Sequence, residues 1–337
     1  MSIVNSYKTL DSFVKLESAF KKELEKVEKY INYVVKEQPL WFQEVINHLV
    51  KAGGKRVRPL LVCLSYSIVS NKEINDKVIA LAGIAEYVHT ATLFHDDVID
   101  EGHERRGKPT ANKVYGNHTA VLGGDFILGK VFSELNKLGN PELLTTMIDT
   151  VSKLIDGEIH QMDMKIKSRV TLEDYERLIY LKTASLFEWS MVAGGLIANK
   201  DSETVLNLRK MGFHIGRIFQ IIDDILDYTG SNILGKKRLQ DFHQGKITLP
   251  LLFLFRKDEK YFYSWKEMLE SNDEKLADKV SNEFVKRIKK DDLQKEMLSY
   301  LEEDINSIKD ILDNKLPNSE FHKYMNNLID FLVSRIY

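Results

Sequence analysis

Two short acidic stretches carry the residue types best suited to chemistry in this chain. Both lie in apolar, helix-like sequence and share the spacing D-D-x-x-D. The six aspartates are Asp96, Asp97 and Asp100 in the first stretch and Asp223, Asp224 and Asp227 in the second. On a helix, acids four positions apart lie on one face, so each cluster repels itself unless a cation lies among the oxygens. Carboxylate oxygens suit magnesium, and two such clusters on facing helices could hold several Mg²⁺ ions around one diphosphate.

Basic segments accompany the acids. The loop Gly53-Gly54-Lys55-Arg56-Val57-Arg58-Pro59 has paired glycines, three cations and a proline suited to the first turn of the next helix. Such a loop is a natural anion site, although a solvated turn is an equally plain interpretation of it in isolation. It is not a Walker A loop. The pair Arg105-Arg106 follows the first acid cluster, and arginine favours bidentate phosphate contact.

A third basic segment follows the second acid cluster. Residues from about 230 to 245 are rich in glycine and charge, and they include Lys236 and Asp241, with Lys246 directly after them. This composition predicts a loop that could close over a phosphate as a lid. Between the clusters, Glu158 and Gln161 share one helical face, and we expect them to line a cavity near that lid.

The elements that must position these residues are helices. Prolines number only six in 337 residues, and long stretches lack both proline and glycine, which favours a mostly helical, all-α chain. The segments with helical periodicity are residues 8–35, 40–50, 77–99, 141–165, 172–197, 203–229 and 247–335. We expect one domain over 1–337, with a core at about 40–255 and further helices at about 256–337. Within the helical stretch around Gly123-Gly124, the glycines indicate close helix contact or an opening for substrate.

Composition excludes several classes of protein. The formal net charge of -2 gives no general attraction to nucleic acid. The single cysteine, Cys63, excludes a disulfide framework and a cysteine metal site, and its apolar neighbours predict a buried thiol. The first residues lack the pattern of a secretory signal, and no uncharged apolar run approaches about 18 residues. These observations predict a soluble, cytoplasmic protein.

Together these motifs resemble the polyprenyl diphosphate synthase family, the trans-isoprenyl chain-elongating enzymes, over residues from about 50 to 255. The resemblance implies a large antiparallel helix bundle around a deep central cavity, usually in a homodimer. It also implies a reaction in which an allylic diphosphate ionises and isopentenyl diphosphate adds to the allylic carbon. About three Mg²⁺ ions would assist at each site. The expected partners are these two substrates and, for product release, a transient membrane contact, with no nucleic acid.

The resemblance also assigns residues by position. It implies that all six aspartates bind metal, and that every aspartate except Asp227, together with Lys182, acts directly in catalysis. The residues matched to substrate contacts are Lys55, Arg58, His89, Arg105, Arg106, Lys182, Thr183, Gln220, Lys236 and Lys246. Of these, Lys55, Arg58, His89 and Arg106 match the pocket for isopentenyl diphosphate. Asp241 matches an outer acid near the metals. The chain departs from the family pattern in 235–241, which lacks the usual proline and glycine before the aspartate.

The length of the product depends on the depth of the cavity. A helix rises about 5.4 Å per turn, close to one extended isoprene unit, so a large residue one turn below Asp96 would stop growth early. Ala91 and Thr92 stand there, and both are small. We therefore expect a product of roughly five or more isoprene units, as in octaprenyl or solanesyl diphosphate synthases. Tyr87 and Val88 are candidates for a deeper floor, with Phe132 a weaker one; ordinary core packing of Ala91 is the alternative.

Other interpretations remain open at this level. A short-chain synthase that makes geranylgeranyl or farnesyl diphosphate has the same chemistry and differs only in its product. A class I terpene cyclase shares the first acid motif, but it normally has another metal motif in place of the second D-D-x-x-D. A non-catalytic subunit of a heteromeric synthase tends to lose acids, whereas all six are present here. The motifs contain no evident strong base, so we expect the departing diphosphate to accept the proton.

Overall fold

The computed structural model describes residues 12–50, 54–105, 107–167, 169–229, 239–271 and 273–335. The regular structure in these residues is almost entirely helical, and this confirms the expected all-α fold. One small exception is a hairpin in which Glu104 pairs with Pro109 and Arg105 with Lys108. The predicted lid and its Lys236, as well as Arg106, lie outside the described residues.

The described elements follow one another along the chain with short connections. Those in the first half are α2 (Lys21–Val34), α3 (Leu40–Val50), α4 (Val57–Ser70), α5 (Asp76–Ile99), β1 (Glu104–Arg105), β2 (Lys108–Pro109), α6 (Ala111–Tyr115), α7 (Asn117–Lys137) and α8 (Pro141–Ile166). Those in the second half are α9 (Leu172–Ile179), η1 (Tyr180–Ala184), α10 (Ser185–Ile197), α11 (Ser202–Thr229), α12 (Gln240–His243), α13 (Leu249–Lys257), α14 (Lys260–Glu270), α15 (Glu274–Ile288), α16 (Asp291–Asp310), η3 (Ile311–Lys315) and α17 (His322–Ser334).

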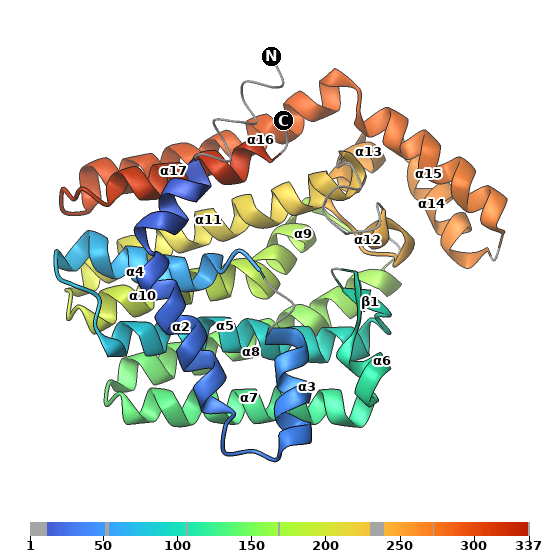
Figure 1. Cartoon of the computed structure of the whole chain (residues 1–337). Coiled ribbons are helices and arrows are strands. Elements are labelled where there is room, and N and C mark those ends of the chain that lie inside the picture. Colours follow the sequence, from blue (N-terminus) through green and yellow to red (C-terminus); the bar gives the residue numbers. More distant parts are fainter. Residues whose placement is uncertain are drawn as a thin grey trace.

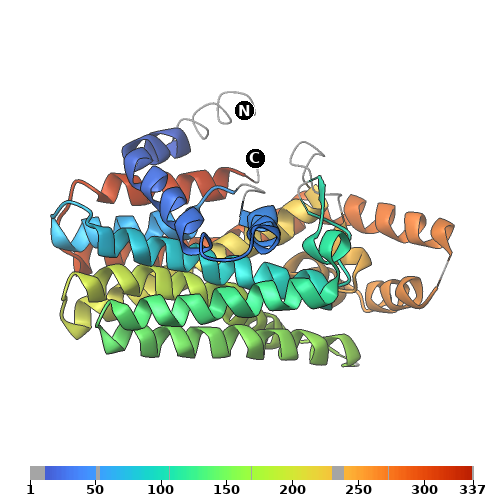
Figure 2. The ribbon, with the colours of Figure 1, turned by 60° about the horizontal axis from the view of Figure 1, so that its bottom comes forward.

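Long helices form the body of the molecule, as Figures 1 and 2 show. Helices α4, α5 and α10 are apolar over most of their circumference, so they are buried at the centre, where α4 packs on both α5 and α10. Helices α7 and α11 cover this centre, the first against α5 and the second against α10. Helix α2 is amphipathic and lies on the outside against α5, as its periodicity predicts.

Helix starts are fixed by side chains that the sequence makes recognisable. The Asn75 side chain accepts hydrogen bonds from the backbone amides of Lys77 and Val78 at the start of α5. Asn140 does the same for α8, with Pro141 in its first turn. Thr171 and Asp174 form a capping box that begins α9. These caps fix the residues at which α5, α8 and α9 begin, and so which of their side chains face the site.

One irregular turn interrupts the predicted helix over 172–197. Residues Tyr180–Ala184 form a π-helical turn between α9 and α10, and such turns recur at functional sites. Helix α8 passes close to this turn at Gly157, where a Cβ would lie 2.7 Å from the Lys182 Cγ. Only glycine leaves room for the lysine side chain on its present path.

The glycine pair in α7 allows close helix packing, one of the two predicted roles. A Cβ on Gly123 would lie 3.2 Å from the Phe94 ring, and one on Gly124 would lie 2.7 Å from His95 Cδ2. Both neighbours are on α5, just before and within the first aspartate stretch. The contact therefore fixes the end of α5 that carries Asp96.

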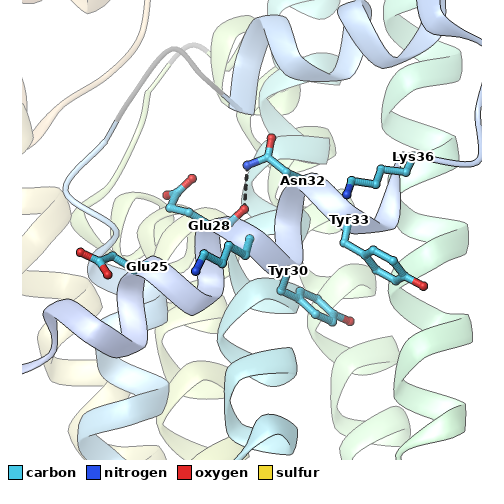
Figure 3. A pocket seen from close by; sticks show the side chains of 7 residues that line it. Glu25, Glu28, Tyr30, Asn32, Tyr33 and Lys36 are labelled. Atoms are coloured by element: carbon cyan, nitrogen blue, oxygen red, sulfur yellow. Dashed lines mark hydrogen bonds between the residues drawn. The ribbon is translucent and has the colours of Figure 1, made fainter.

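Helix α5 is long and apolar enough to cross a membrane. However, 72% of its 18-residue apolar stretch is buried inside the bundle, which identifies α5 as a core helix. Figure 3 shows an open groove along α2 that is lined by Glu25, Glu28, Lys29, Tyr30, Asn32, Tyr33 and Lys36. This groove contains none of the predicted site residues, so we assign it no part in the chemistry.

The last helices return to the body of the molecule. Helix α16 packs on α11, and α17 packs on both α11 and α4. One continuous hydrophobic cluster includes buried residues from Phe13 to Leu332; the single domain stays a prediction. Because α17 packs on α11, Arg335, at the end of α17, is brought to the second aspartate motif.

Candidate active site

The first aspartate motif lies at the end of α5. Asp97 is buried, with only 4% of its surface exposed, and its Oδ1 accepts hydrogen bonds from Arg105 Nε (3.1 Å) and Nη2 (2.8 Å). Its backbone carbonyl accepts further bonds from the Asn112 side chain and the Gly102 amide. Asp97 thus fixes both the loop after α5 and Arg105, which the resemblance assigns to a diphosphate.

The other two acids of this motif lie near lysines from distant elements. Asp100 Oδ2 accepts a 2.7 Å hydrogen bond from Lys246 Nζ. Burial raises the pKa of Asp96 to about 7; the nearby Lys182 opposes this rise, while Glu158 and Asp100 add to it. A cation bound beside this carboxyl would favour its ionised form and so oppose the rise in its pKa.

Lys182 connects the first motif with α8. Its ammonium group donates a 3.0 Å hydrogen bond to Gln161 Oε1 and forms an ion pair with Glu158. Glu158 and Gln161 therefore share a face, as expected, and that face is turned towards Lys182. Their position beside the lid stays a prediction, because the lid lies outside the described residues.

The second motif, near the end of α11, is held mostly by neutral donors. Asp224 is 4% exposed; its Oδ2 accepts from the Tyr175 hydroxyl (2.8 Å) and the Leu249 amide (3.4 Å), and its Oδ1 from Gln220 Nε2 (2.8 Å). Burial raises the pKa of Asp224 to about 7, with Asp241 and Asp223 adding to the rise and the side-chain donors opposing it.

The remaining acids of the second motif differ in their surroundings. Asp227 is buried and accepts a 3.2 Å bond from the Gln240 amide at the start of α12. Asp223 is less buried and forms an ion pair with Arg335 Nη2 at 3.5 Å. Among the described contacts, Asp223 thus faces a cation, whereas Asp224 and Asp227 accept hydrogen bonds from the protein.

The two motifs line the same region. Lys246, which bonds to Asp100, also lies 3.8 Å from Asp241, whose charge reaches Asp224. Adjacent residues of the π turn make a second link: Lys182 lies beside Asp96, and the Thr183 hydroxyl donates a 2.7 Å bond to the side chain of Gln220. The structure thus brings Lys182, Thr183, Gln220 and Lys246 together with both motifs.

A basic cluster lies next to Asp223. Lys55 Nζ is 4.3 Å from the centre of the Phe331 ring, and Arg58 Cζ is 4.7 Å from the centre of the Phe187 ring. Desolvation lowers the pKa of Lys55 to about 8; Arg335 adds to this, and Asp223 opposes it. The neighbouring Arg56 instead forms ion pairs with Glu28 and Glu86. Arg58 is affected by the charge of Glu86, so Lys55 is the cation of this loop that the structure relates to Asp223.

The predicted floor residues are placed on different sides of α5. Ala91 and Val88 are fully buried. Thr92 is half-buried and donates a 2.8 Å bond to the carbonyl of His89, itself half-buried. The Tyr87 hydroxyl donates to the carbonyl of Ile31 in α2. Tyr87 therefore leans towards the outer helix, and Val88 is the better candidate for a deeper floor.

Two residues of the site were missed by sequence reasoning. Arg335 follows α17, far along the chain from both motifs, and no motif surrounds it. Tyr175 lies in an ordinary amphipathic helix. The only signal for either is indirect: a buried aspartate needs donors, and these can come from anywhere in the fold.

The donor set suits magnesium only in combination with a substrate. Among the described residues, no group of three or more His, Cys, Asp or Glu side chains is arranged to hold a metal ion by itself. Mg²⁺ is usually bound by one or two carboxylates and by substrate phosphates, rather than by an all-protein cage. The partly exposed carboxylates of Asp96, Asp100 and Asp223 fit that description.

Comparison with known proteins agrees with this geometry. A family model described as polyprenyl synthetase matches residues 39–287, well over half of the chain. Octaprenyl diphosphate synthase of Escherichia coli is 39% identical over 227 residues, which is 66% of this chain and 70% of that protein. All-trans-nonaprenyl-diphosphate synthase (geranyl-diphosphate specific) of Rhodobacter capsulatus is also 39% identical, over 67% and 69% of the two chains.

Solved structures show the same fold. Heptaprenyl diphosphate synthase from Staphylococcus aureus superposes with a TM-score of 0.86 at 31% identity, covering 94% of this chain and 99% of that one. A polyprenyl synthase from Caulobacter crescentus, complexed with calcium and isoprenyl diphosphate, gives a TM-score of 0.87 at 28% identity, covering 96% and 98%. Since the matched segment contains both aspartate motifs, Lys182 and Lys246, the chain belongs to the polyprenyl synthetase family and is a prenyltransferase.

Proposed function

We propose that this enzyme condenses an allylic diphosphate with successive isopentenyl diphosphate units to make a long-chain all-trans polyprenyl diphosphate. The observation that carries the proposal is the convergence of two D-D-x-x-D motifs on one region, where each motif presents acids paired with cations. The octaprenyl and nonaprenyl synthases among its relatives support a long product.

The six aspartates divide into two groups in this proposal. Asp96, Asp100 and Asp223 would hold Mg²⁺, and the bound metal would supply Lewis acidity at the diphosphate oxygens, an effect on the order of several kcal/mol. The other three, Asp97, Asp224 and Asp227, would fix the helices and Arg105, because protein donors already engage them. About three ions per site is the expectation from the family resemblance.

The cations of the site change partners when the substrate binds. Lys182, Lys246 and Arg335 neutralise acids in this structure. With metal bound at those acids, Lys182 and Lys246 would be released to bind the allylic diphosphate, and Arg335, beside Lys55, to bind the isopentenyl diphosphate. Arg105 is already fixed by Asp97. Charge that moves onto the leaving diphosphate is then stabilised more in the transition state than in the ground state, which lowers the barrier.

The apolar surface of α5 has a separate task. The allylic cation must not meet water, and the fully buried Val88 and Ala91 supply a dry wall one to two turns below Asp96. We assign proton acceptance to the departing diphosphate, because the described side chains nearest the two motifs are acids, paired cations and neutral hydrogen-bond donors, and none of them is an evident strong base. A non-metal residue whose change stops turnover while metals still bind would contradict this assignment.

Turnover with defined substrates tests the function. Purified protein is incubated with Mg²⁺, labelled isopentenyl diphosphate and a series of allylic primers, and the dephosphorylated products are sized by chromatography. The expected result is chains of about five or more isoprene units. A product that stops at three or four units would indicate the short-chain alternative. Hydrocarbon formed from the primer alone would indicate a terpene cyclase.

Chain length is tested by one substitution on α5. Ala91→Phe places a ring in the proposed tunnel, so the products should become shorter by several units. Tyr87→Phe is the control, since it removes only a hydroxyl group that bonds to α2, and its products should keep their length. An unchanged product distribution in Ala91→Phe would refute the floor at this position.

Homodimer formation, a cytoplasmic location and transient membrane contact belong to the same proposal. Helix α8 presents a row of exposed apolar side chains, among them Ile155, Ile159 and Met162, which a partner subunit could cover. Light scattering of the purified protein would distinguish a dimer from a monomer. Whether a partner subunit is needed is decided by the turnover of the chain purified alone.

A further inference from the structure

The structure assigns to Tyr175 the role of a positioning residue, which holds Asp224 so that the second motif can bind Mg²⁺. This inference rests on the proposed function of the motif, and it adds a residue that lies in neither motif. Tyr175 is 1% exposed, and its hydroxyl donates a 2.8 Å hydrogen bond to Asp224 Oδ2. A buried hydroxyl aimed at a carboxylate of the site is a strong, specific contact.

The two oxygens of Asp224 are held from one continuous helical segment. Tyr175 contacts Oδ2 directly, and Thr183 reaches Oδ1 through Gln220. In a regular α-helix, residues eight apart point about 80° away from each other. The π turn Tyr180–Ala184 accommodates one extra residue in that interval. It therefore brings Thr183 back to the face of Tyr175, towards α11.

Helix α9 has a second anchor that does not involve the hydroxyl. Glu176, the next residue, forms an ion pair with Arg217 of α11, and Arg217 also pairs with the buried Asp304 of α16 at 3.1 Å. Loss of the Tyr175 hydroxyl should therefore leave α9 in place. The effect of such a change would be confined to the orientation of Asp224 and of its neighbour Asp223.

The test replaces Tyr175 by phenylalanine and measures metal binding directly. Free Mn²⁺, a spectroscopic substitute for Mg²⁺, is titrated by electron paramagnetic resonance in the presence of inorganic diphosphate. Loss of an outer-shell partner of this kind typically weakens metal affinity about tenfold or more, and we expect that loss in Tyr175→Phe. Tyr87→Phe is the matched control: Tyr87 is almost as deeply buried, but its hydroxyl donates to the Ile31 carbonyl in α2. It should bind Mn²⁺ like the unaltered protein.

A double substitution makes the test specific. If Tyr175 acts through Asp224, then Tyr175→Phe should weaken Mn²⁺ binding no further in an Asp224→Asn background. Equal Mn²⁺ affinity in Tyr175→Phe and the unaltered protein would overturn the inference, as would fully additive effects in the double variant. Helical circular dichroism and thermal unfolding of each variant separate these outcomes from misfolding. The Mn²⁺ titration needs no turnover, so it tests the role of Tyr175 separately from the proposed function. Failure of the unaltered enzyme to elongate a primer would count against the proposed function alone.

Discussion

The two aspartate motifs have the same spacing but different surroundings. In the first, the buried Asp97 is held by a charged partner, Arg105. In the second, the corresponding Asp224 is held by a tyrosine hydroxyl, a glutamine amide and a backbone amide. Each motif nevertheless keeps its first acid near a cation. A motif read from sequence thus identifies the residue types, while the fold decides which of them remain available to a ligand.

This difference gives the motifs different properties. The charged pair at Asp97 makes the first motif depend on a loop arginine, Arg105, which the family resemblance assigns to the diphosphate. At Asp224, burial raises the pKa to about 7, and the neutral donors oppose this rise only in part, so in the second motif the protein-held acid itself can exchange a proton near neutral pH. The motifs are therefore not interchangeable, and substitutions can separate them.

The largest effect is expected on kcat, and it should differ between the aspartates that would bind metal and those that protein donors hold. Asp100→Asn and Asp223→Asn should each lower kcat about 10³-fold, because the loss of metal Lewis acidity removes several kcal/mol of transition-state stabilisation. Asp97→Asn and Asp224→Asn should lower it only about 10- to 100-fold, as expected of outer residues. Steady-state kinetics with a fixed primer measures all four. Equal decreases in kcat in all four variants would contradict the distinction between metal-binding and protein-held aspartates.

The cations should separate the two substrates. Lys246→Gln removes the partner of Asp100 and should raise KM for the allylic diphosphate, whereas Arg335→Gln, beside Lys55, should raise KM for isopentenyl diphosphate. A charged hydrogen bond contributes about 1.5–3 kcal/mol, so each increase should be about 10- to 100-fold. Initial rates with one substrate varied at a time provide the measurement. An increase in the KM for the same substrate in both variants would contradict the assignment.

Stability should distinguish the two buried aspartates. Asp97→Asn leaves Arg105 without its counter-charge and should lower the free energy of unfolding by about 2 kcal/mol. Asp224→Asn should cost less than about 1 kcal/mol near pH 7, because the Gln220 amide can turn over and Thr183 can then accept its hydrogen bond. Urea unfolding monitored by circular dichroism measures both values. A larger loss for Asp224→Asn would reverse the comparison.

The smallest effect is a pH dependence of the metal-free protein. Burial raises the pKa of Asp96 and of Asp224 to about 7, above the ordinary value of 3.8 for aspartate. Between about pH 4 and 7 the folded form therefore holds protons that the unfolded form has lost, and stability falls as pH rises. Above pH 7 this effect is complete and levels off.

Thermal unfolding without metal should show this as a decrease in Tm of a few degrees between pH 5 and pH 7.5. The decrease should be smaller in Asp224→Asn, because one of the two titrating carboxyls is gone. A Tm that rises over this interval in both proteins would mean that other groups dominate the titration.

Much of the helical layout can be predicted from the sequence. Asn75, Asn140 and the Thr171 capping box mark helix starts by local chemistry, so α5, α8 and α9 begin close to their predicted positions. The acids and most of the cations are also recognisable, because they lie in motifs. The assignment of individual metal ligands stays a prediction.

Three features could not be predicted, for physical reasons. The π turn joins α9 to α10 with no glycine or proline to mark it, so the sequence shows no break there. The contact of Arg335 with Asp223 depends on the packing of α17 against α11. The direction of Tyr87 towards α2 depends on where that outer helix lies. Each is decided by tertiary contacts rather than by local sequence.

The close approach of α8 to the π turn has a consequence for tolerance to mutation. Gly157 touches the path of Lys182, whereas a Cβ on Gly129 in α7 would meet nothing within 4 Å. In a saturation library selected for growth that depends on this enzyme, position 157 should retain glycine alone, and position 129 should accept alanine readily. A residue without a side chain would then rank among the least replaceable in the protein, because of the room it leaves for a lysine.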